Sequence, residues 1–190
     1  TATHTAMPLG DRPYAIVTSE GERPTNFSNE HGAFGIGLPC DKIKHNMNMF
    51  GIFDIEDKSH PVLISMIPQP IVPEGYTHGT NFHFVDGVRV PFGPHNMFDA
   101  FGRDVYEKRD DRIYNAYFQA GLRVYDVSDP FVPKEIAFFM PPDPEERLVK
   151  GGTAAAGPLV AVTEDVLVDD RGYIYVDTFN DGLYIVKCTV

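Results

Sequence analysis

The sequence has no tryptophan and only two cysteines in 190 residues. Two cysteines are too few for the disulfide framework of a small secreted domain, and they leave oxidising and reducing compartments open. No apolar run reaches the about 20 residues that a membrane-spanning helix needs. No basic segment followed by an apolar one opens the chain as a signal peptide would. The sequence therefore predicts a protein without a membrane span.

Positive charge is also scarce, because 16 Lys and Arg residues stand against 27 Asp and Glu residues, a formal net charge of −11. A field of this sign repels phosphate, and no basic cluster opposes it, so nucleic acid is excluded as a partner. No nucleotide cofactor is expected either, because Gly151 and Gly152 lack the Lys and Ser/Thr that follow in a phosphate-binding loop. The chain also has no Gly-x-Ser-x-Gly nucleophile motif.

Long helices are the next absence, since Gly or Pro interrupts every stretch with helical spacing of apolar residues. The chain is instead rich in Gly (17), Pro (16), Phe (14) and Tyr (9). Runs of β-branched and aromatic residues between turn residues predict strands at 14–17, 112–117, 121–125 and 172–176. Nothing before Pro13 has this pattern. The sequence predicts an all-β protein.

An internal repeat organises these strands. At an offset of 72, IFDIED (52–57) falls on VYDVSD (124–129), and at an offset of 61, GLRV (121–124) falls on GLYI (182–185). One unit therefore occurs three times. It consists of two strands, a Gly turn, a third strand that ends in Asp-x-x-Asp, and a fourth strand.

The turns of this unit have a simple chemistry. Asp126 and Asp129 are expected to accept hydrogen bonds from nearby backbone amides, and Gly121 permits the conformation that the preceding turn needs. A calcium loop is the alternative for the two carboxylates, but the EF-hand pattern is absent. The repeat favours turns.

Four antiparallel strands in a repeated unit predict the blades of a β-propeller. We place blades at about 13–70, 94–141 and 159–190, with inserted loops at about 18–44, 71–93, 98–110 and 143–158. The last unit lacks its fourth strand, and three blades are fewer than the about four to eight of a closed ring. We therefore expect part of a larger ring, completed by an absent N-terminal segment, a second chain or a symmetry mate.

The segments GLRVYDVSDP (121–130), DVLVDDRGYIYV (165–176) and GLYIV (182–186) resemble LVIVD-repeat β-propeller proteins, mainly over 94–190. The segment PHNM (94–97) is similar to one in a subgroup of that family where a second His follows; Phe98 stands in that place here. The resemblance implies a propeller that is often exported or surface-associated, and it implies no reaction. We expect an extracytoplasmic location, with the cytoplasm left open.

Histidine is the most suggestive residue type, with seven in the chain. Five of them lie in the predicted loops and strand starts that a propeller gathers around its axis: His31, His45, His78, His83 and His95. Imidazoles gathered in this way bind Fe, Cu or Zn, so His45, His78, His83 and His95 are the candidate metal ligands. The alternative is that each one is a hydrogen-bonded loop residue. His60 and His4 are assigned no site.

Two carboxylates accompany this predicted site. The repeat places Glu164 and Asp165 in the last blade where His95 stands in the preceding one. They are the candidate catalytic residues, either as bases or as acceptors that orient ligating imidazoles. A disulfide between Cys40 and Cys188 is a further open possibility.

Two functions follow from these residues. The first is a metal-dependent enzyme that acts on a small molecule at a His and carboxylate cluster near the propeller axis. The second is a non-catalytic propeller that binds protein or a surface glycan, because no complete catalytic motif is present. The substrate is not specified by the sequence.

Overall fold

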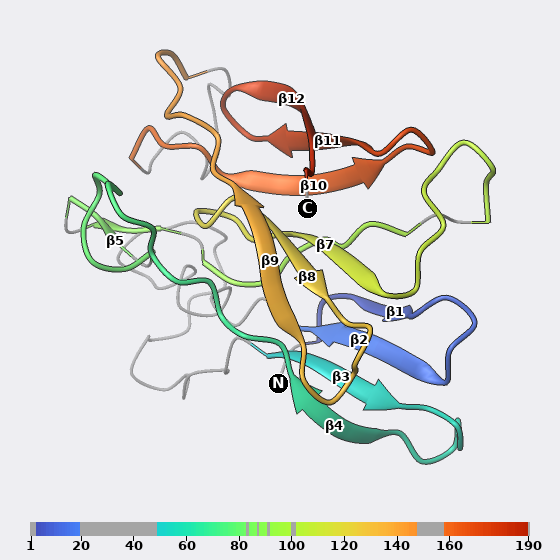
Figure 1. Ribbon diagram of the computed structural model, residues 1–190. Helices are drawn as coiled ribbons and strands as arrows, with labels where there is room; N and C mark the ends of the chain where they lie inside the picture. Colours follow the sequence, from blue (N-terminus) through green and yellow to red (C-terminus); the bar gives the residue numbers. More distant parts are fainter. Residues whose placement is uncertain are drawn as a thin grey trace, which may run out of the picture.

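The computed structural model describes residues 3–19, 49–82, 84–86, 88–90, 92–99, 102–147 and 158–189. Within these residues the chain forms β-strands and no helix, which confirms the all-β prediction (Figure 1). The strands are β1 (Ala6–Pro8), β2 (Tyr14–Thr18), β3 (Phe50–Asp54), β4 (Val62–Met66), β5 (Phe84–Val85), β6 (Val88–Arg89), β7 (Arg112–Ala116), β8 (Leu122–Asp126), β9 (Lys134–Phe139), β10 (Thr163–Val168), β11 (Tyr173–Thr178) and β12 (Gly182–Lys187).

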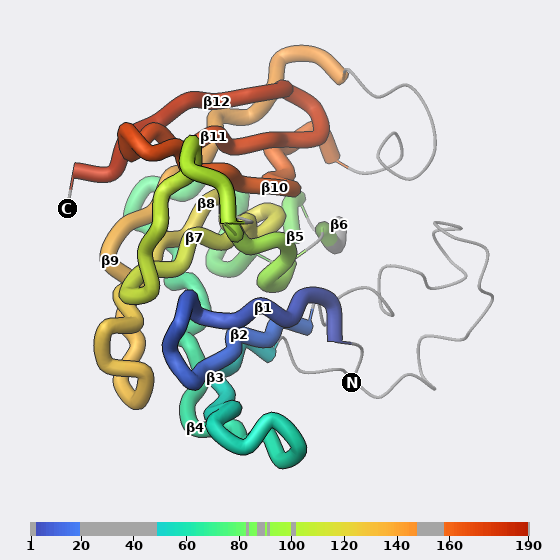
Figure 2. The backbone as a smooth tube through the Cα atoms, turned by 90° about the vertical axis from the view of Figure 1, so that its right-hand side faces the viewer, coloured from blue at the N-terminus to red at the C-terminus, as the bar shows by residue number. Residues whose placement is uncertain are grey.

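These strands form three main antiparallel sheets, each with its strands in chain order. Sheet 1 is β1-β2-β3-β4, sheet 2 is β7-β8-β9 and sheet 3 is β10-β11-β12, while β5 and β6 form a separate hairpin. Figures 1 and 2 show the sheets as successive layers, with sheet 2 between sheet 1 and sheet 3. No helix in the described ranges is long and apolar enough to cross a membrane.

The hydrophobic core lies on both faces of sheet 2. Alternate residues of a strand point to opposite faces, so β7 and β8 supply two sets of apolar side chains. One set, with Ile113 and Tyr125, packs with Ile16 and Ile52 of sheet 1. The other set, Tyr114, Leu122 and Val124, packs with residues of sheet 3: Val166, Val168, Ile174 and Val176. Sheet 2 is therefore the central layer, and both faces of β7 and β8 are covered.

The strands recur at the offsets that the sequence predicts. The offset of 72 carries Phe50, the first residue of β3, onto Leu122, the first residue of β8, and it relates the starts of β4 and β9 in the same way. A register shift between Ile52 and Phe53 in sheet 1 recurs between Val124 and Tyr125 in sheet 2, at the same offset. The two units therefore share a bulge as well as strand order.

The offset of 61 relates sheet 2 to sheet 3 in the same way. β7 falls on β11, β8 falls on β12, and the hairpin glycines Gly121 and Gly182 have φ values of +77° and +84°. A Cβ on Gly121 would also overlap the carbonyl oxygen of Phe139. Both the positive φ and the lack of space therefore require glycine at this position.

The Asp-x-x-Asp turns also have the expected hydrogen bonds. Asp126 Oδ1 accepts from the Ser128 amide at 2.9 Å, and Asp129 Oδ1 accepts from the Phe131 amide at 3.0 Å. In sheet 1, Asp54 and Asp57 accept in the same way from Glu56 and Ser59. These carboxylates act as turn acceptors, as the repeat predicts.

A further segment pairs with the outer edge of β7. The amide of His95 donates to the carbonyl of Ala116, and the amide of Phe98 donates to the carbonyl of Tyr114. The segment 95–98 thus stands beside β7 as β1 stands beside β2 and β10 beside β11. Each repeat therefore begins with an edge segment that precedes its two central strands.

One expectation about the strands was wrong. β1 lies before Pro13, where no strand was predicted, because the edge of β2 offers backbone groups that three residues satisfy without a β-branched pattern. The predicted loop 71–93 contains the hairpin of β5 and β6. Most of the predicted loop 18–44 and part of 143–158 lie outside the described residues.

Candidate functional site

The sequence-predicted residues His95 and Glu164 meet between sheets 2 and 3. The Nδ1 of His95 lies 2.8 Å from the backbone oxygen of Glu164 and 3.6 Å from its Oε2. A carbonyl can only accept, so Nδ1 carries the proton in this bond. His95 is 9% exposed, and its pairing with Glu164 is therefore largely shielded from water.

A backbone bridge brings these two residues together. Phe118 and Thr163 exchange two hydrogen bonds, with N···O distances of 3.1 and 3.0 Å, and so join the end of β7 to the start of β10. Phe118 has a φ of +47°, a strained conformation for a residue with a side chain. Its ring stacks on His95 with centroids 4.4 Å apart. The strained turn positions both the neighbouring strand and the imidazole.

His4 belongs to the same place, although the sequence assigned it no site. Its ring centroid lies 4.5 Å from that of His95. The hydroxyls of Thr5 and Thr18 each lie 3.4 Å from the His95 carbonyl oxygen. His4 stands just before β1 as His95 stands at the start of its own edge segment. The repeat would have indicated this equivalence if β1 had been recognised as a strand.

Asp165 does not take the position expected of it. It is exposed, and its Oδ1 accepts a hydrogen bond from the adjacent Val166 amide at 2.8 Å. The register of β10 shifts between Thr163 and Asp165, which changes the alternation of side chains at this point. Glu164, and not Asp165, therefore lies against His95.

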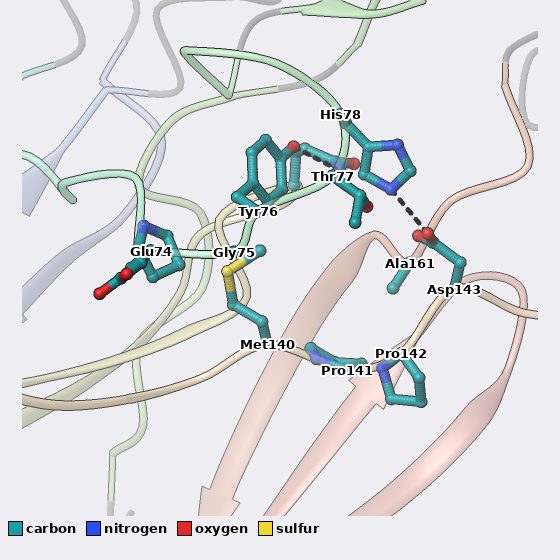
Figure 3. Close-up of a pocket in the computed structure, with 12 residues that line it drawn as sticks. Glu74, Gly75, Tyr76, Thr77, His78, Met140, Pro141, Pro142, Asp143 and Ala161 are labelled. Atoms are coloured by element: carbon teal, nitrogen blue, oxygen red, sulfur yellow. Dashed lines mark hydrogen bonds and ion pairs between the residues drawn. The ribbon is translucent and has the colours of Figure 1, made fainter.

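His78 lies in a separate cavity of about 250 Å³, which is lined by neither His95 nor Glu164 (Figure 3). The wall of this cavity comes from loops 73–78 and 140–143, with Gln119 and Ala161. The Nε2 of His78 lies 2.6 Å from Oδ2 of Asp143. The side chains are 19% and 40% exposed, so both remain accessible to solvent. The sequence placed Asp143 only at the start of the predicted loop 143–158.

Tyr76 and Gln119 add a partly buried polar contact to the cavity. The Nε2 of Gln119 donates to the Tyr76 hydroxyl at 3.1 Å, and the Tyr76 ring meets the His78 ring edge to face at 5.4 Å. Burial raises the pKa of Tyr76; the Gln119 hydrogen bond opposes this shift, and the charge of Asp143 adds to it. The phenol is therefore neutral near pH 7 and keeps a proton to donate.

The His78–Asp143 pair can hold and move a proton. A carboxylate beside one imidazole nitrogen fixes the orientation of the ring, and the tautomer with Nε2–H leaves Nδ1 as an acceptor. Met140, Pro141 and Pro142 supply apolar wall beside this pair. The cavity thus joins a proton-transfer pair, a neutral phenol and apolar surface, which suits a small ligand with both polar and apolar parts.

The predicted metal site is only partly covered by the described residues. His45 and His83 lie outside them, as do His31 and Cys40. Among the residues that the structure does describe, no three His, Cys, Asp or Glu side chains come together as possible metal ligands. His95 and His78 belong to different surroundings. The described residues therefore do not by themselves fit a transition metal, and the Cys40–Cys188 disulfide stays a prediction.

Comparisons with known proteins add no identity to this geometry. No family model, no curated protein and no solved structure matches the chain. The function is accordingly inferred from the two groups of residues described above.

Proposed function

We propose that this chain is part of a β-propeller of the LVIVD-repeat kind and acts on a small molecule in the cavity of His78 and Asp143. Three stacked antiparallel sheets with a shared strand order and a shared bulge support the propeller, because blades are repeated antiparallel sheets. The family resemblance of 121–130 and 182–186 points the same way.

The observation that carries the site is the 2.6 Å contact between His78 Nε2 and Asp143 Oδ2 in an accessible cavity. In this proposal His78 accepts a proton from the bound molecule or from water, and Asp143 stabilises the imidazolium that forms. Tyr76 donates a hydrogen bond to a polar group of the ligand. The cavity is smaller than the about 300–1,000 Å³ of drug-sized sites, which favours a small ligand.

A metal would extend this proposal through His45, His83 or both, which lie outside the described residues. Of the two described members of the predicted ligand set, His78 lines this cavity, and Asp143 is the carboxylate that orients it. The proton transfer between His78 and the ligand needs no metal. Elemental analysis of the purified chain for Fe, Cu and Zn tests this extension directly.

The second candidate is a non-catalytic propeller that binds protein or a surface glycan. One observation favours it: His95 is 9% exposed, bonded to the Glu164 carbonyl and in contact with the rings of His4 and Phe118. An imidazole so engaged stabilises the junction of the sheets. In this alternative His95 and Glu164 are structural, and the loops provide the binding surface.

Ligand screening with matched variants tests the proposal. Small polar molecules are screened by their effect on the melting temperature of the chain, and each hit is repeated on His78→Gln and Asp143→Asn. We expect both variants to weaken binding of the same molecules by tenfold or more, whereas His60→Gln, an exposed turn residue, leaves it unchanged. Hits that bind equally to the wild type and both variants would contradict the cavity as the site.

A further inference from the structure

The repeat gives each sheet two distinct faces. The front face of sheet 1 is defined as the face that carries Ile16, Phe50 and Ile52. The front face of each other sheet is the one that carries the equivalent residues of the repeat. The offsets and strand pairings place Tyr114, Leu122 and Val124 on the front face of sheet 2, and Tyr175, Leu183 and Ile185 on that of sheet 3. The opposite surface of each sheet is its back face.

Inside the chain, front faces pack on back faces. The front face of sheet 1 meets the back face of sheet 2, which carries Ile113 and Tyr125; the rings of Phe50 and Tyr125 lie 5.4 Å apart. The front face of sheet 2 meets the back face of sheet 3, which carries Ile174 and Val176. The same contact is therefore made twice, by equivalent residues.

The front face of sheet 3 has the composition of an interface but no described sheet packed on it. Leu122 is 1% exposed, whereas its equivalent Leu183 is 59% exposed; Val124 is 1% exposed and its equivalent Ile185 is 58% exposed. Asp177 lies on the same face beside Leu183. Leu183 is the same residue type as its buried equivalent and Ile185 is apolar like Val124, but no sheet in the described part of the chain covers them.

The back face of sheet 1 is the matching surface at the other end of the stack. It carries Ala15, Val17 and Phe53, which are partly exposed, and Gly51, which is buried; their equivalents in sheet 2 are covered. Leu63, paired with Phe53, is 46% exposed. No charged side chain belongs to these positions. Sheet 2 separates the two uncovered faces, so they do not meet within the described part of one chain (Figures 1 and 2).

We propose that the front face of sheet 3 packs on the back face of sheet 1 of a second copy of this chain. This inference rests on the propeller of the proposed function, and it continues the front-on-back contact already made twice within the chain. A head-to-tail contact builds a closed ring when the rotation is completed. Two copies of three sheets give six, within the about four to eight blades of propellers, whereas three copies exceed that range. The geometry points to a two-fold ring with two identical contacts.

The mass of the particle is the first test. Native mass spectrometry and light scattering at micromolar concentration are expected to give twice the 21.2 kDa of one chain. Leu183→Lys and Ile185→Lys together bury charge in both contacts, so we expect a monomer with an unchanged circular dichroism spectrum. Phe131→Lys, an exposed apolar residue of the β8–β9 turn, is the matched control and is expected to stay dimeric.

Mixing two monomeric variants tests the front-on-back arrangement itself. In a two-fold ring, Leu183→Lys breaks both contacts of its own dimer, and so does Leu63→Glu. When the two are mixed, one contact joins two unchanged faces and the other joins Lys to Glu, so we expect dimers that contain one copy of each variant. Failure of the mixture to associate would overturn this arrangement.

The outcomes separate this inference from the proposed site. If the wild-type chain stays monomeric at micromolar concentration but binds a ligand through His78, the proposed two-copy ring is wrong and the proposed ligand site is supported. If Leu183→Lys dissociates the dimer and His78→Gln changes the binding of no ligand, the ring is supported and the proposed proton transfer at His78 is wrong. An association that depends on neither uncovered face also overturns the inference.

Discussion

Gly121 shows how one residue type is required at one place in the repeat and only preferred at another. Its φ of +77° favours glycine, and a Cβ there would overlap the Phe139 carbonyl oxygen. Gly182, its equivalent, has a similar φ, but among the described residues no atom lies within 4 Å of the place that a Cβ would take. The backbone strain is therefore shared, and the steric overlap belongs to Gly121 alone.

Substituting alanine at these two glycines separates the two effects. Gly182→Ala is expected to lower the free energy of unfolding by about 1 kcal/mol, the strain of a positive φ. Gly121→Ala adds displacement of β9 and is expected to lower it by about 2–4 kcal/mol. Urea denaturation of both variants measures the difference. If both variants lose the same free energy of unfolding, displacement of β9 does not contribute, which would contradict this prediction.

Arg123 is a residue whose role the sequence did not indicate. Its side chain is fully buried, donates to the Ala120 carbonyl at 2.8 Å and pairs with Glu135 at 3.0 Å. Burial lowers the pKa of Arg123, and the charge of Glu135 opposes that shift. The guanidinium also lies over the Phe138 ring, 4.8 Å from its centroid. The equivalent position in sheet 1 is Gly51, which has no side chain, so the buried ion pair is not shared by the two units.

At the scale of the element, the β10–β11 hairpin is organised by the carboxylate of Asp169. It accepts hydrogen bonds from the amides of Arg171 and Tyr173, from the Arg171 guanidinium and from the Tyr175 hydroxyl. Desolvation alone would raise the pKa of Asp169, but these hydrogen bonds outweigh it and lower the pKa to about 2. The turn therefore depends on the ionised form.

Acid should loosen this hairpin. A carboxyl whose pKa is lower in the folded state stabilises above its unfolded pKa of about 3.9, and that contribution is lost as the pH falls toward 2. Asp169→Asn is expected to be less stable than the wild type at pH 7 and to lose less stability between pH 4 and pH 2. Asp170→Asn, the exposed neighbour, is the control. Thermal unfolding across this pH range makes the comparison, and parallel wild-type and Asp169→Asn curves would contradict it.

At the scale of the whole molecule, equivalent residues differ in what covers them. Leu122→Ala leaves a cavity between sheets 2 and 3, and we expect it to lower the free energy of unfolding by about 2–5 kcal/mol. Because folding and association are linked, Leu183→Ala should instead lower the melting temperature mainly at concentrations where the wild type is dimeric. Melting curves over a hundredfold range of concentration distinguish the two. A concentration-independent loss in Leu183→Ala would contradict the second copy.

Much of the fold was predictable because its cause is local. The repeat offsets of 72 and 61, the strands β2, β7, β8 and β11, and the Asp turns all follow from alternation and turn chemistry within short segments. β1 was missed because its three residues pair through backbone groups alone. The hairpin of β5 and β6 was missed because strands this short carry no periodicity.

The candidate site was less predictable because its contacts are long-range. The repeat indicated His95 and Glu164, which do meet, through a bridge between Phe118 and Thr163 that no local pattern shows. His78 was expected beside other imidazoles, but the fold sets it against Asp143 of a distant loop. Pairing between loops depends on where the sheets place them.

The amino-acid sequence by itself determined that this chain is built of repeated antiparallel strands, because side-chain alternation, Gly turns and Asp acceptors act over a few residues. Its scarcity of positive charge predicted against nucleic acid as a partner, and its lack of long apolar runs predicted no membrane span. Only the tertiary structure decided which faces are covered, since equivalent residues such as Leu122 and Leu183 differ in burial and not in type. It also decided that His78 lies against a carboxylate in a cavity, because that contact joins two loops that are far apart in the sequence.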